Sequence, residues 1–307
     1  MGLQRCCCYL LACLALNAGY ATGAGSGAEI SVVDDTGRTL RLAAPARRIV
    51  ALAPHIVENL FAAGAGAYLV GVTEYSDFPA AAKKLPRLGD FARLDLEAIV
   101  ALHPDLVIAW ASGNPAAYLD KLKTLGLPLF ISEPRSLADV AASVERFGQL
   151  AATTAVAAPA AQALRRRSDS LRRLYAGRPA VRVFYQLWNQ PLATVNGKHL
   201  ISEVLRLCGG DNVYAGLHQL APTLDVEAVL AADPEAIIAS GMDAARPEWL
   251  DMWKRWPALT ASARGNLFFV PPDLINRPTG RVVDGAEIVC RHLQTARARR
   301  PAQAGSR

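Results

Sequence analysis

Residues 154–176, TAVAAPAAQALRRRSDSLRRLYA, set the organisation of the whole chain. They predict one long helix, because the segment is rich in alanine, leucine and arginine and because Pro159 stands near its start, where a missing N–H does little harm. Gly177 and Pro179 then end the helix. At about 1.5 Å per residue such a helix is roughly 35 Å long, which is enough to span the back of two small lobes.

An internal repeat indicates that two related lobes flank this helix. Residues 95–109, DLEAIVALHPDLVIA, return at residues 225–239 as DVEAVLAADPEAIIA, with seven of fifteen residues identical. Residues 56–64 and 201–209 form a second, weaker pair. Each copy of the first pair combines a short helical pattern, a proline and an apolar run typical of a buried parallel strand. We therefore predict an α/β fold class, with two similar α/β lobes joined by a single long backbone helix.

The two ends of the chain differ from the lobes. Arg5 precedes an apolar stretch, and small residues follow it, so we predict an export signal over residues 1–23. Leu10-Leu11-Ala12-Cys13 also resembles a lipoprotein cleavage box, which would instead leave a lipid anchor at Cys13. We expect an N-terminal lobe over residues 24–153, the helix over 154–177, a C-terminal lobe over 178–296 and a disordered basic tail over 297–307.

Composition and motifs exclude several classes of protein. The net charge is +6, but Arg5 and the five arginines of residues 291–307 account for all of it, so nucleic-acid binding has no electrostatic support. Phosphate-loop, dinucleotide and nucleophile-elbow motifs are missing. The five histidines are scattered along the sequence, which argues against a metal site. We therefore predict that the protein is not an enzyme and has no catalytic or metal site.

The cysteines are typical of an exported protein. Four of the six lie within the predicted signal, which leaves Cys208 and Cys290 in the mature chain. An even pair in an exported protein favours a disulfide, which would stabilise the fold by about 4 kcal/mol in the chain-entropy account. Two separate buried thiols are the alternative.

Aromatic and charged residues stand near the ends of predicted strands, where open α/β sheets bind ligands. These residues are Tyr75, Phe91, Trp110, Trp188, Asp273 and Arg277. Flat apolar surfaces with a few polar groups suit a bulky, rigid, partly polar ligand held in a cleft. The alternative is that each ring merely covers the end of its own strand.

At these residues the sequence resembles the periplasmic cobalamin-binding proteins of bacterial ABC importers. They belong to a larger group of helical-backbone substrate-binding proteins that also carries haem and ferric siderophores. The resemblance covers about residues 48–293. Its most specific points are Tyr75-Ser76-Asp77-Phe78-Pro79, Leu106-Val107-Ile108-Ala109-Trp110 with Gly113-Asn114, Cys208-Gly209-Gly210, and Cys290. It implies two lobes on one stiff helix, with the corrinoid in a cleft between them.

The resemblance also implies roles for particular residues. Trp110 would line the cleft, and Cys208 would bond to Cys290. Phe91 and Ala221 stand where a relative has cleft tryptophans, which leaves open which corrinoid is bound; His218 could face that ligand. The implied ligand contacts are Tyr75, Asp273, Leu274, Ile275, Asn276 and Arg277.

Glu97 and Glu227 occupy equivalent places in the two repeat copies. The resemblance makes them lobe-tip carboxylates that pair with arginines of the permease, and equivalent acids on two lobes suit a two-fold symmetric partner. Each acid alone is equally well explained as a helix-start residue favoured by the helix dipole.

We therefore predict a periplasmic substrate-binding protein for vitamin transport. As a monomer without a resident cofactor, it would capture cobalamin or a related corrinoid and deliver it to an ABC permease dimer with a cytoplasmic ATPase. Haem or a ferric siderophore is the alternative ligand, with Tyr75 as an iron ligand and Arg277 as the partner of an anion. An exported enzyme or sensor subunit with the same fold is the alternative from another class.

Overall fold

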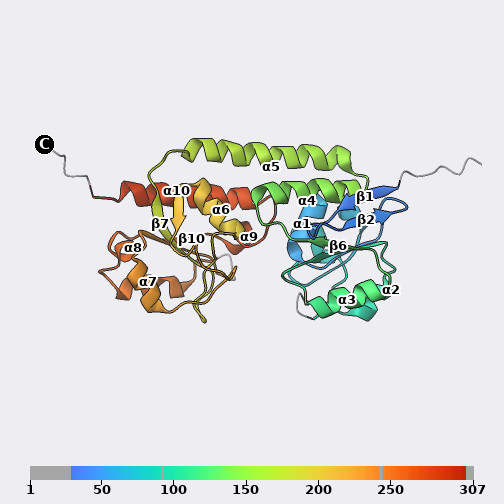
Figure 1. Ribbon diagram of the computed structural model, residues 1–307, viewed down its shortest axis with the longest axis horizontal. Coiled ribbons are helices and arrows are strands. Elements are labelled where there is room, and N and C mark those ends of the chain that lie inside the picture. Colours follow the sequence, from blue (N-terminus) through green and yellow to red (C-terminus); the bar gives the residue numbers. More distant parts are fainter. Residues whose placement is uncertain (1–28, 91–92, 242–244, 302–307) are drawn as a thin grey trace, which may run out of the picture.

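The computed structural model describes residues 29–90, 93–241 and 245–301. Two parallel four-stranded sheets, one in each lobe, lie on the same side of helix α5 (Thr154–Tyr175), which runs along the back of both (Figure 1). The predicted fold class is confirmed. The predicted signal, residues 1–23, lies outside the described residues. Within the described ranges, no helix is both long and apolar enough to cross a membrane.

Helix α5 packs on the lobes through one narrow stripe. The buried residues follow the 3.6-residue period of a helix. They are Ala157, Ala161, Leu164 and Ser168. Small side chains in this stripe let α4 (Leu137–Leu150) approach α5 closely. A Cβ on Gly148 of α4 would lie only 2.3 Å from the Cβ of Ala157, so the contact requires glycine there. Figure 1 shows α4 under one end of α5 and α10 (Val282–Ala298) under the other, so three helices form the back of the molecule.

The N-terminal lobe begins with an antiparallel hairpin and continues with a sheet of order β4-β3-β5-β6. Its strands are runs of Val, Ile, Leu and Ala that are buried on both faces, as expected for a parallel sheet covered by helices. In chain order the elements are β1 (Ile30–Val33), β2 (Thr39–Leu42), β3 (Ile49–Ala51), α1 (Pro54–Ala62), η1 (Gly66–Tyr68), β4 (Leu69–Val72), η2 (Ala80–Lys84), α2 (Leu96–Ala101), β5 (Leu106–Trp110), α3 (Ala116–Thr124), β6 (Leu129–Ser132) and α4.

The C-terminal lobe has the same sheet topology, with order β8-β7-β9-β10. Strand β7 occupies the place of β3, and β9 that of β5, so the internal repeat corresponds to equivalent pieces of the two lobes. In chain order the elements are β7 (Val181–Gln186), α6 (Leu200–Leu207), β8 (Gly210–Asn212), α7 (Val226–Ala232), β9 (Ala236–Ala239), η3 (Glu248–Arg255), α8 (Thr260–Ala263), β10 (Leu267–Phe269), α9 (Pro272–Ile275) and α10.

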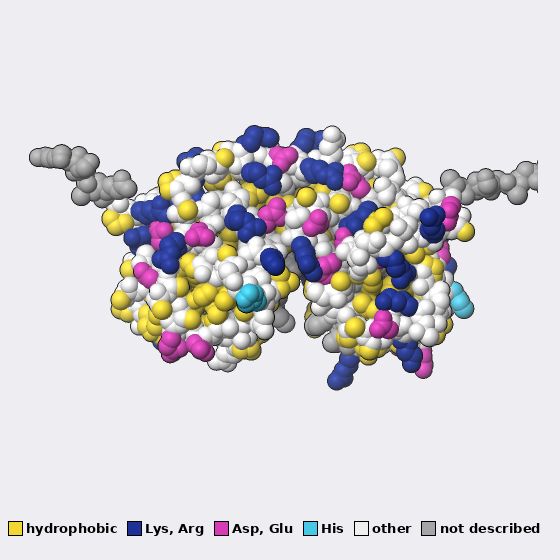
Figure 2. All heavy atoms as spheres, viewed as in Figure 1, with side chains coloured by type: hydrophobic (Ala, Val, Ile, Leu, Met, Phe, Trp, Pro, Cys, Tyr) yellow, Lys and Arg dark blue, Asp and Glu magenta, His cyan; other side chains and the backbone are white. Residues whose placement is uncertain are grey.

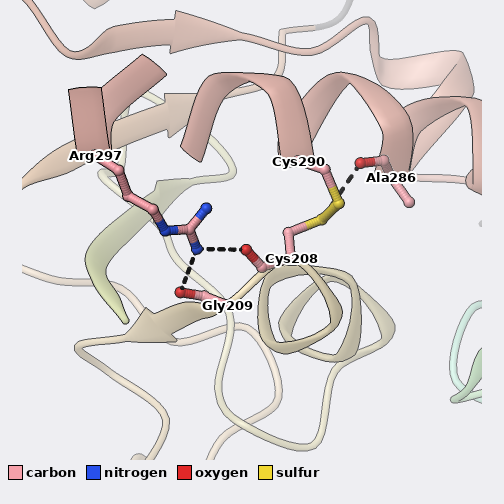
Figure 3. The surroundings of a disulfide bond; sticks show 5 residues. All are labelled: Cys208, Gly209, Ala286, Cys290 and Arg297. Atoms are coloured by element: carbon pink, nitrogen blue, oxygen red, sulfur yellow. Dashed lines mark hydrogen bonds between the residues drawn. A yellow bond between two sulfur atoms is a disulfide. The ribbon is translucent and has the colours of Figure 1, made fainter. Parts of the chain in front are cut away.

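A disulfide joins Cys208, at the end of α6, to Cys290 in α10 (Figure 3). Both residues are fully buried. The predicted pairing is therefore confirmed, and the alternative of two free thiols is wrong. The bond holds the C-terminal helix against the C-terminal lobe.

The predicted disordered tail is wrong at its start, because α10 continues to Ala298. Arg297 donates to the carbonyl oxygens of Cys208 at 2.7 Å and Gly209 at 3.1 Å, just after α6 ends (Figure 3). Arg300 binds the carboxylate of Glu235 at 2.8 and 2.9 Å. These charged hydrogen bonds offset the entropy that ordering the segment costs. Residues 302–307 lie outside the described residues.

Candidate ligand-binding cleft

The two lobes face each other across a cleft on the side away from α5. In Figure 2 the cleft is seen as a notch between the two lobes at the bottom of the view. A narrow cavity of about 70 Å³ lies between them, lined from the N-terminal lobe by Trp110 and Glu133 and from the C-terminal lobe by His199 and Asn276. Trp110 and Glu133 stand at the carboxyl ends of β5 and β6, which is the edge where open parallel sheets bind ligands.

Trp110, the last residue of β5, is held firmly at the wall of this cavity. Its backbone N–H donates to Oδ1 of Asn114 at 2.7 Å, and Nδ2 of Asn114 donates to the carbonyl of Leu52 at 3.0 Å. The indole lies directly over Gly113, where a Cβ would come within 1.8 Å of the ring, so only glycine permits this position. The motif that follows β5 therefore fixes the orientation of an aromatic surface.

His55 packs behind this ring and was missed from the sequence, where a histidine after Pro54 carries no special signal. Its ring meets Trp110 edge to face at a centroid distance of 5.2 Å. The side chain is buried, and its Nε2 has no hydrogen-bond partner among the described residues. Burial, with a smaller contribution from the charge of Arg277, lowers the pKa of His55 to about 3. The imidazole is therefore neutral in the folded protein near neutral pH.

This buried histidine predicts acid sensitivity. The unfolded chain takes up a proton near pH 6.5 and the folded protein only near pH 3, so stability is complete above pH 6.5 and falls as the pH decreases toward 3. At pH 5 we expect His55 to cost about 2 kcal/mol of the free energy of unfolding. Urea unfolding of wild type and His55→Asn at pH 5 and 7.5 measures this. An equal pH dependence in both proteins would contradict it.

Arg277, just after α9, is bound by three carboxylates. Its guanidinium contacts Glu58 at 3.1 Å, Asp77 at 2.8 Å and Asp273 at 3.2 Å. Burial opposes the ionisation of Asp77, but the hydrogen bond and the charge of Arg277 outweigh it and lower the pKa of this carboxyl. The structure thus brings the predicted site residues Asp273 and Arg277 together and adds two acids from the N-terminal lobe.

The residues between Asp273 and Arg277 differ in their access to the cleft. Oδ1 of Asn276 accepts from the hydroxyl groups of Tyr185 at 3.2 Å and Ser240 at 3.1 Å, which leaves its Nδ2 to act as a donor. Leu274 is half-buried. Ile275 has almost no solvent-exposed surface but lines the interlobe cavity next to Asn276.

The other predicted aromatic residues lie on the surface. Tyr75 is 67% exposed and has a φ of 62°, a backbone conformation uncommon for a residue with a side chain. Trp188 is 37% exposed, and its Nε1–H donates to the carbonyl of Gln190 at 3.0 Å. Phe91 lies outside the described residues. Neither Tyr75 nor Trp188 is tucked into the interior of its lobe, so both rings are accessible to a large ligand.

Two polar residues of the cavity wall were missed because they come from loops without a motif. Glu133 accepts from the backbone N–H of Ser112 at 2.9 Å and from its hydroxyl at 3.0 Å, and it lies 3.7 Å from Nε of Arg135. His199 caps α6 by accepting from the N–H of Ile201 on Nδ1 at 3.1 Å. Burial lowers the pKa of His199 to about 4, so the neutral ring carries its proton on Nε2.

Glu97 and Glu227 are the second residues of α2 and α7, and both are exposed. Asp95 caps α2 by accepting from the N–H of Ala98 at 2.9 Å. His218 is also exposed. The two acids thus stand at equivalent exposed helix starts, one in each lobe.

Two matching lobes, a backbone helix and an interlobe cleft define a receptor for a small molecule. The chain belongs to the periplasmic binding protein family, whose profile matches residues 49–274. A vitamin B12-binding protein of Vibrio cholerae is 39% identical over 253 residues, which cover 82% of this chain and 91% of that protein. The corresponding protein of Vibrio campbellii is 37% identical over 257 residues, with coverages of 83% and 92%.

Solved structures agree with this assignment. The crystal structure of the periplasmic vitamin B12 binding protein of Vibrio cholerae superposes with a TM-score of 0.76 at 38% identity, covering 82% of this chain and 98% of that one. A periplasmic haem-binding protein from Roseiflexus has a TM-score of 0.71 at 22% identity, with coverages of 81% and 99%, and shares the fold. These relatives confirm the family resemblance and the prediction of a binding protein rather than an enzyme.

Proposed function

We propose that this chain captures cobalamin or a related corrinoid between its lobes and delivers it to an ABC import permease. Two kinds of observation support the proposal. Relatives at 37–39% identity over most of the chain are vitamin B12-binding proteins. The cleft presents a fixed tryptophan together with several hydrogen-bonding side chains, which suits a flat, rigid, partly polar ligand.

The observation that favours a corrinoid over haem or a ferric siderophore is the environment of Arg277. Its guanidinium is already shared among three carboxylates, so it cannot serve as the partner of an anionic ligand. Around the cavity, Arg135 faces Glu133 at 3.7 Å, and His199 is neutral. The corrin periphery carries uncharged amides, whereas haem and most siderophores carry negative charge. The occupied guanidinium of Arg277 and the neutral ring of His199 match the amides, while Lys198, also in the cavity wall, has no ion pair among the described residues.

The cavity of about 70 Å³ is much smaller than a corrinoid, so the macrocycle would lie across the mouth of the cleft. The exposed rings of Tyr75 and Trp188 would contact it from the two lobes, and the indole of Trp110 would form part of the wall beneath. Asp273 and the Nδ2 of Asn276 would bind its amides. The cavity would then admit a side arm of the ligand.

Delivery would use the two equivalent acids. Glu97 and Glu227 are exposed and occupy the same position in repeated helices, so each would meet an arginine on one half of a permease dimer. The receptor would act as a monomer, exported by the signal over residues 1–23 or held at the membrane by a lipid on Cys13. It would hold the corrinoid as cargo and need no cofactor of its own.

Calorimetric titration tests this proposal. Cyanocobalamin, dicyanocobinamide, haemin and a ferric catecholate are titrated separately into the protein. We expect a corrinoid to bind with a Kd below about 10 μM, which is about −7 kcal/mol, and haemin and the catecholate to bind more weakly. Tight binding of haemin or the catecholate without corrinoid binding would favour the alternative ligand class.

A further inference from the structure

The weaker repeat pair, residues 56–64 and 201–209, has no part in the proposed function. It places Glu58 and Glu203 at equivalent positions of α1 and α6, the first helix after the first sheet strand of each lobe. A helix of this kind normally directs its carboxylates to solvent. Each of these two carboxylates instead contacts the opposite lobe.

Glu58 fastens the N-terminal lobe to the C-terminal lobe. Its side chain is 4% exposed and accepts from Nε of Arg281 at 2.9 Å, from the terminal amino group of Arg281 at 2.6 Å and from Arg277 at 3.1 Å. The next residue, Asn59, donates from Nδ2 to the carbonyl of Pro278 at 3.0 Å. A carboxylate buried between two arginines forms strong, directional hydrogen bonds, so this contact fixes α1 relative to the segment before α10.

Glu203 makes the reciprocal contact. Its Oε2 accepts at 2.8 Å from the backbone N–H of Leu137, the first residue of α4 in the N-terminal lobe. This N–H has no partner within α4 itself, and the positive end of the helix dipole favours an anion there. The other carboxylate oxygen lies 3.8 Å from the guanidinium of Arg172 on α5. The carboxylate is 23% exposed, so it is only partly screened by water.

Two separate fastenings restrict the lobes more than one would. A single contact beside a long helix still permits rotation about that contact, whereas two contacts at different places oppose it. Both adjoin the cleft, because Pro278, which accepts from Asn59, and Leu200, the first residue of the helix that carries Glu203, line its cavity. These two carboxylates therefore join the lobes at two places beside the cleft, in addition to the ion pair between Asp77 and Arg277 at 2.8 Å.

We propose that Glu58 and Glu203 are positioning residues that together hold the empty cleft at the width its ligand requires. The inference rests on the proposed function only in taking the cleft as the binding site. Because the receptor does not have to order its lobes when it binds, more of the contact energy is retained as affinity. The carboxylates act through the lobe angle and need not touch the ligand.

Interlobe distance measurements test the proposal without a ligand. Spin labels are introduced through a genetically encoded amino acid at Lys121 in α3 and Lys254 in η3, both exposed and one in each lobe. Pulsed electron resonance then gives the distance distribution for wild type, E58Q, E203A and the double variant. The matched control is E235Q, because Glu235 also binds two arginines, Arg264 and Arg300, but these contacts lie wholly within the C-terminal lobe and the segment that follows α10.

We expect one narrow distribution in wild type that is unchanged by cyanocobalamin. It should broaden about twofold in the double variant, and less in each single variant, because hinge motion is released. Cyanocobalamin affinity should fall about tenfold in the double variant. E235Q should lower the Tm without either change. If the double variant does not fold, the distance distribution of E203A alone tests the proposal. This variant is expected to fold, because Glu203 is partly exposed and its loss leaves no buried charge unpaired.

A narrow distribution in the double variant, or in E203A where the double variant does not fold, would overturn the proposal and leave a merely structural role. Failure of wild type to bind any corrinoid would refute the proposed function instead. The distance distributions would still decide the role of Glu58 and Glu203 in that case.

Discussion

Replacing Cys208 and Cys290 together by alanine is expected to lower the free energy of unfolding by about 4 kcal/mol. The disulfide closes a loop with a sequence separation of 82 residues, and releasing such a long loop raises the entropy of the unfolded chain by about this amount in the chain-entropy account. The loss is a large fraction of the 5–15 kcal/mol that is typical of a folded domain. Urea unfolding followed by circular dichroism measures it.

The control for this experiment separates the cross-link from local packing. Val289 is fully buried next to Cys290 in α10, so Val289→Ala removes apolar atoms there without opening the loop. It should cost less than the double cysteine change. If the double cysteine variant lost less than about 1 kcal/mol, the cross-link would contribute little to the fold, and packing and the bonds of Arg297 would hold α10 in place.

Replacing Tyr75 and Trp110 together by alanine is expected to weaken cobalamin binding by at least about 100-fold, or about 2.7 kcal/mol. Tyr75 presents a largely exposed ring, and Trp110 presents a ring fixed over Gly113. Large aromatic surfaces held in one orientation lose little entropy when a ligand covers them, so they dominate affinity. Calorimetric titration of the double variant measures the change.

Tyr118→Ala is the matched control for this pair. Tyr118 is a half-buried aromatic residue of α3 that packs in the N-terminal lobe and does not line the cavity. Its loss should lower stability and leave cobalamin affinity within about threefold of wild type, because the ligand does not touch it. Unchanged affinity in the Tyr75 and Trp110 variant would show that the ligand lies elsewhere.

The fold could be predicted from the sequence because the patterns that indicate it are local and occur twice. The Ala- and Arg-rich run gave α5 within a residue or two, and the copies at residues 95–109 and 225–239 gave equivalent helices and strands. Pro159 shows a limit of this reading. The helix begins at Thr154, so the proline lies in its second turn, on the exposed face, rather than in the first turn where its missing N–H would leave no hydrogen bond unmade.

The candidate site was less predictable, because its polar groups act through contacts that are distant in sequence. Arg277 stood out beside Asp273, but its partners Glu58 and Asp77 are 219 and 200 residues away. No pattern in the sequence indicates contacts over such distances. The sequence therefore left Arg277 open as the partner of an anionic ligand, whereas in the structure its charge is already neutralised by carboxylates of the protein itself. His55 and His199 were missed for the same reason, since burial rather than spacing determines their charge.

The absorption spectrum of the protein purified from cells supplied with corrinoid tests the central claim most directly. A receptor with the proposed cleft should carry its cargo through purification, so we predict visible corrin bands in an amount close to one equivalent per chain. Haem bands in their place, or protein without a chromophore that also fails to take up added cobalamin, would contradict the claim that the cleft binds a corrinoid.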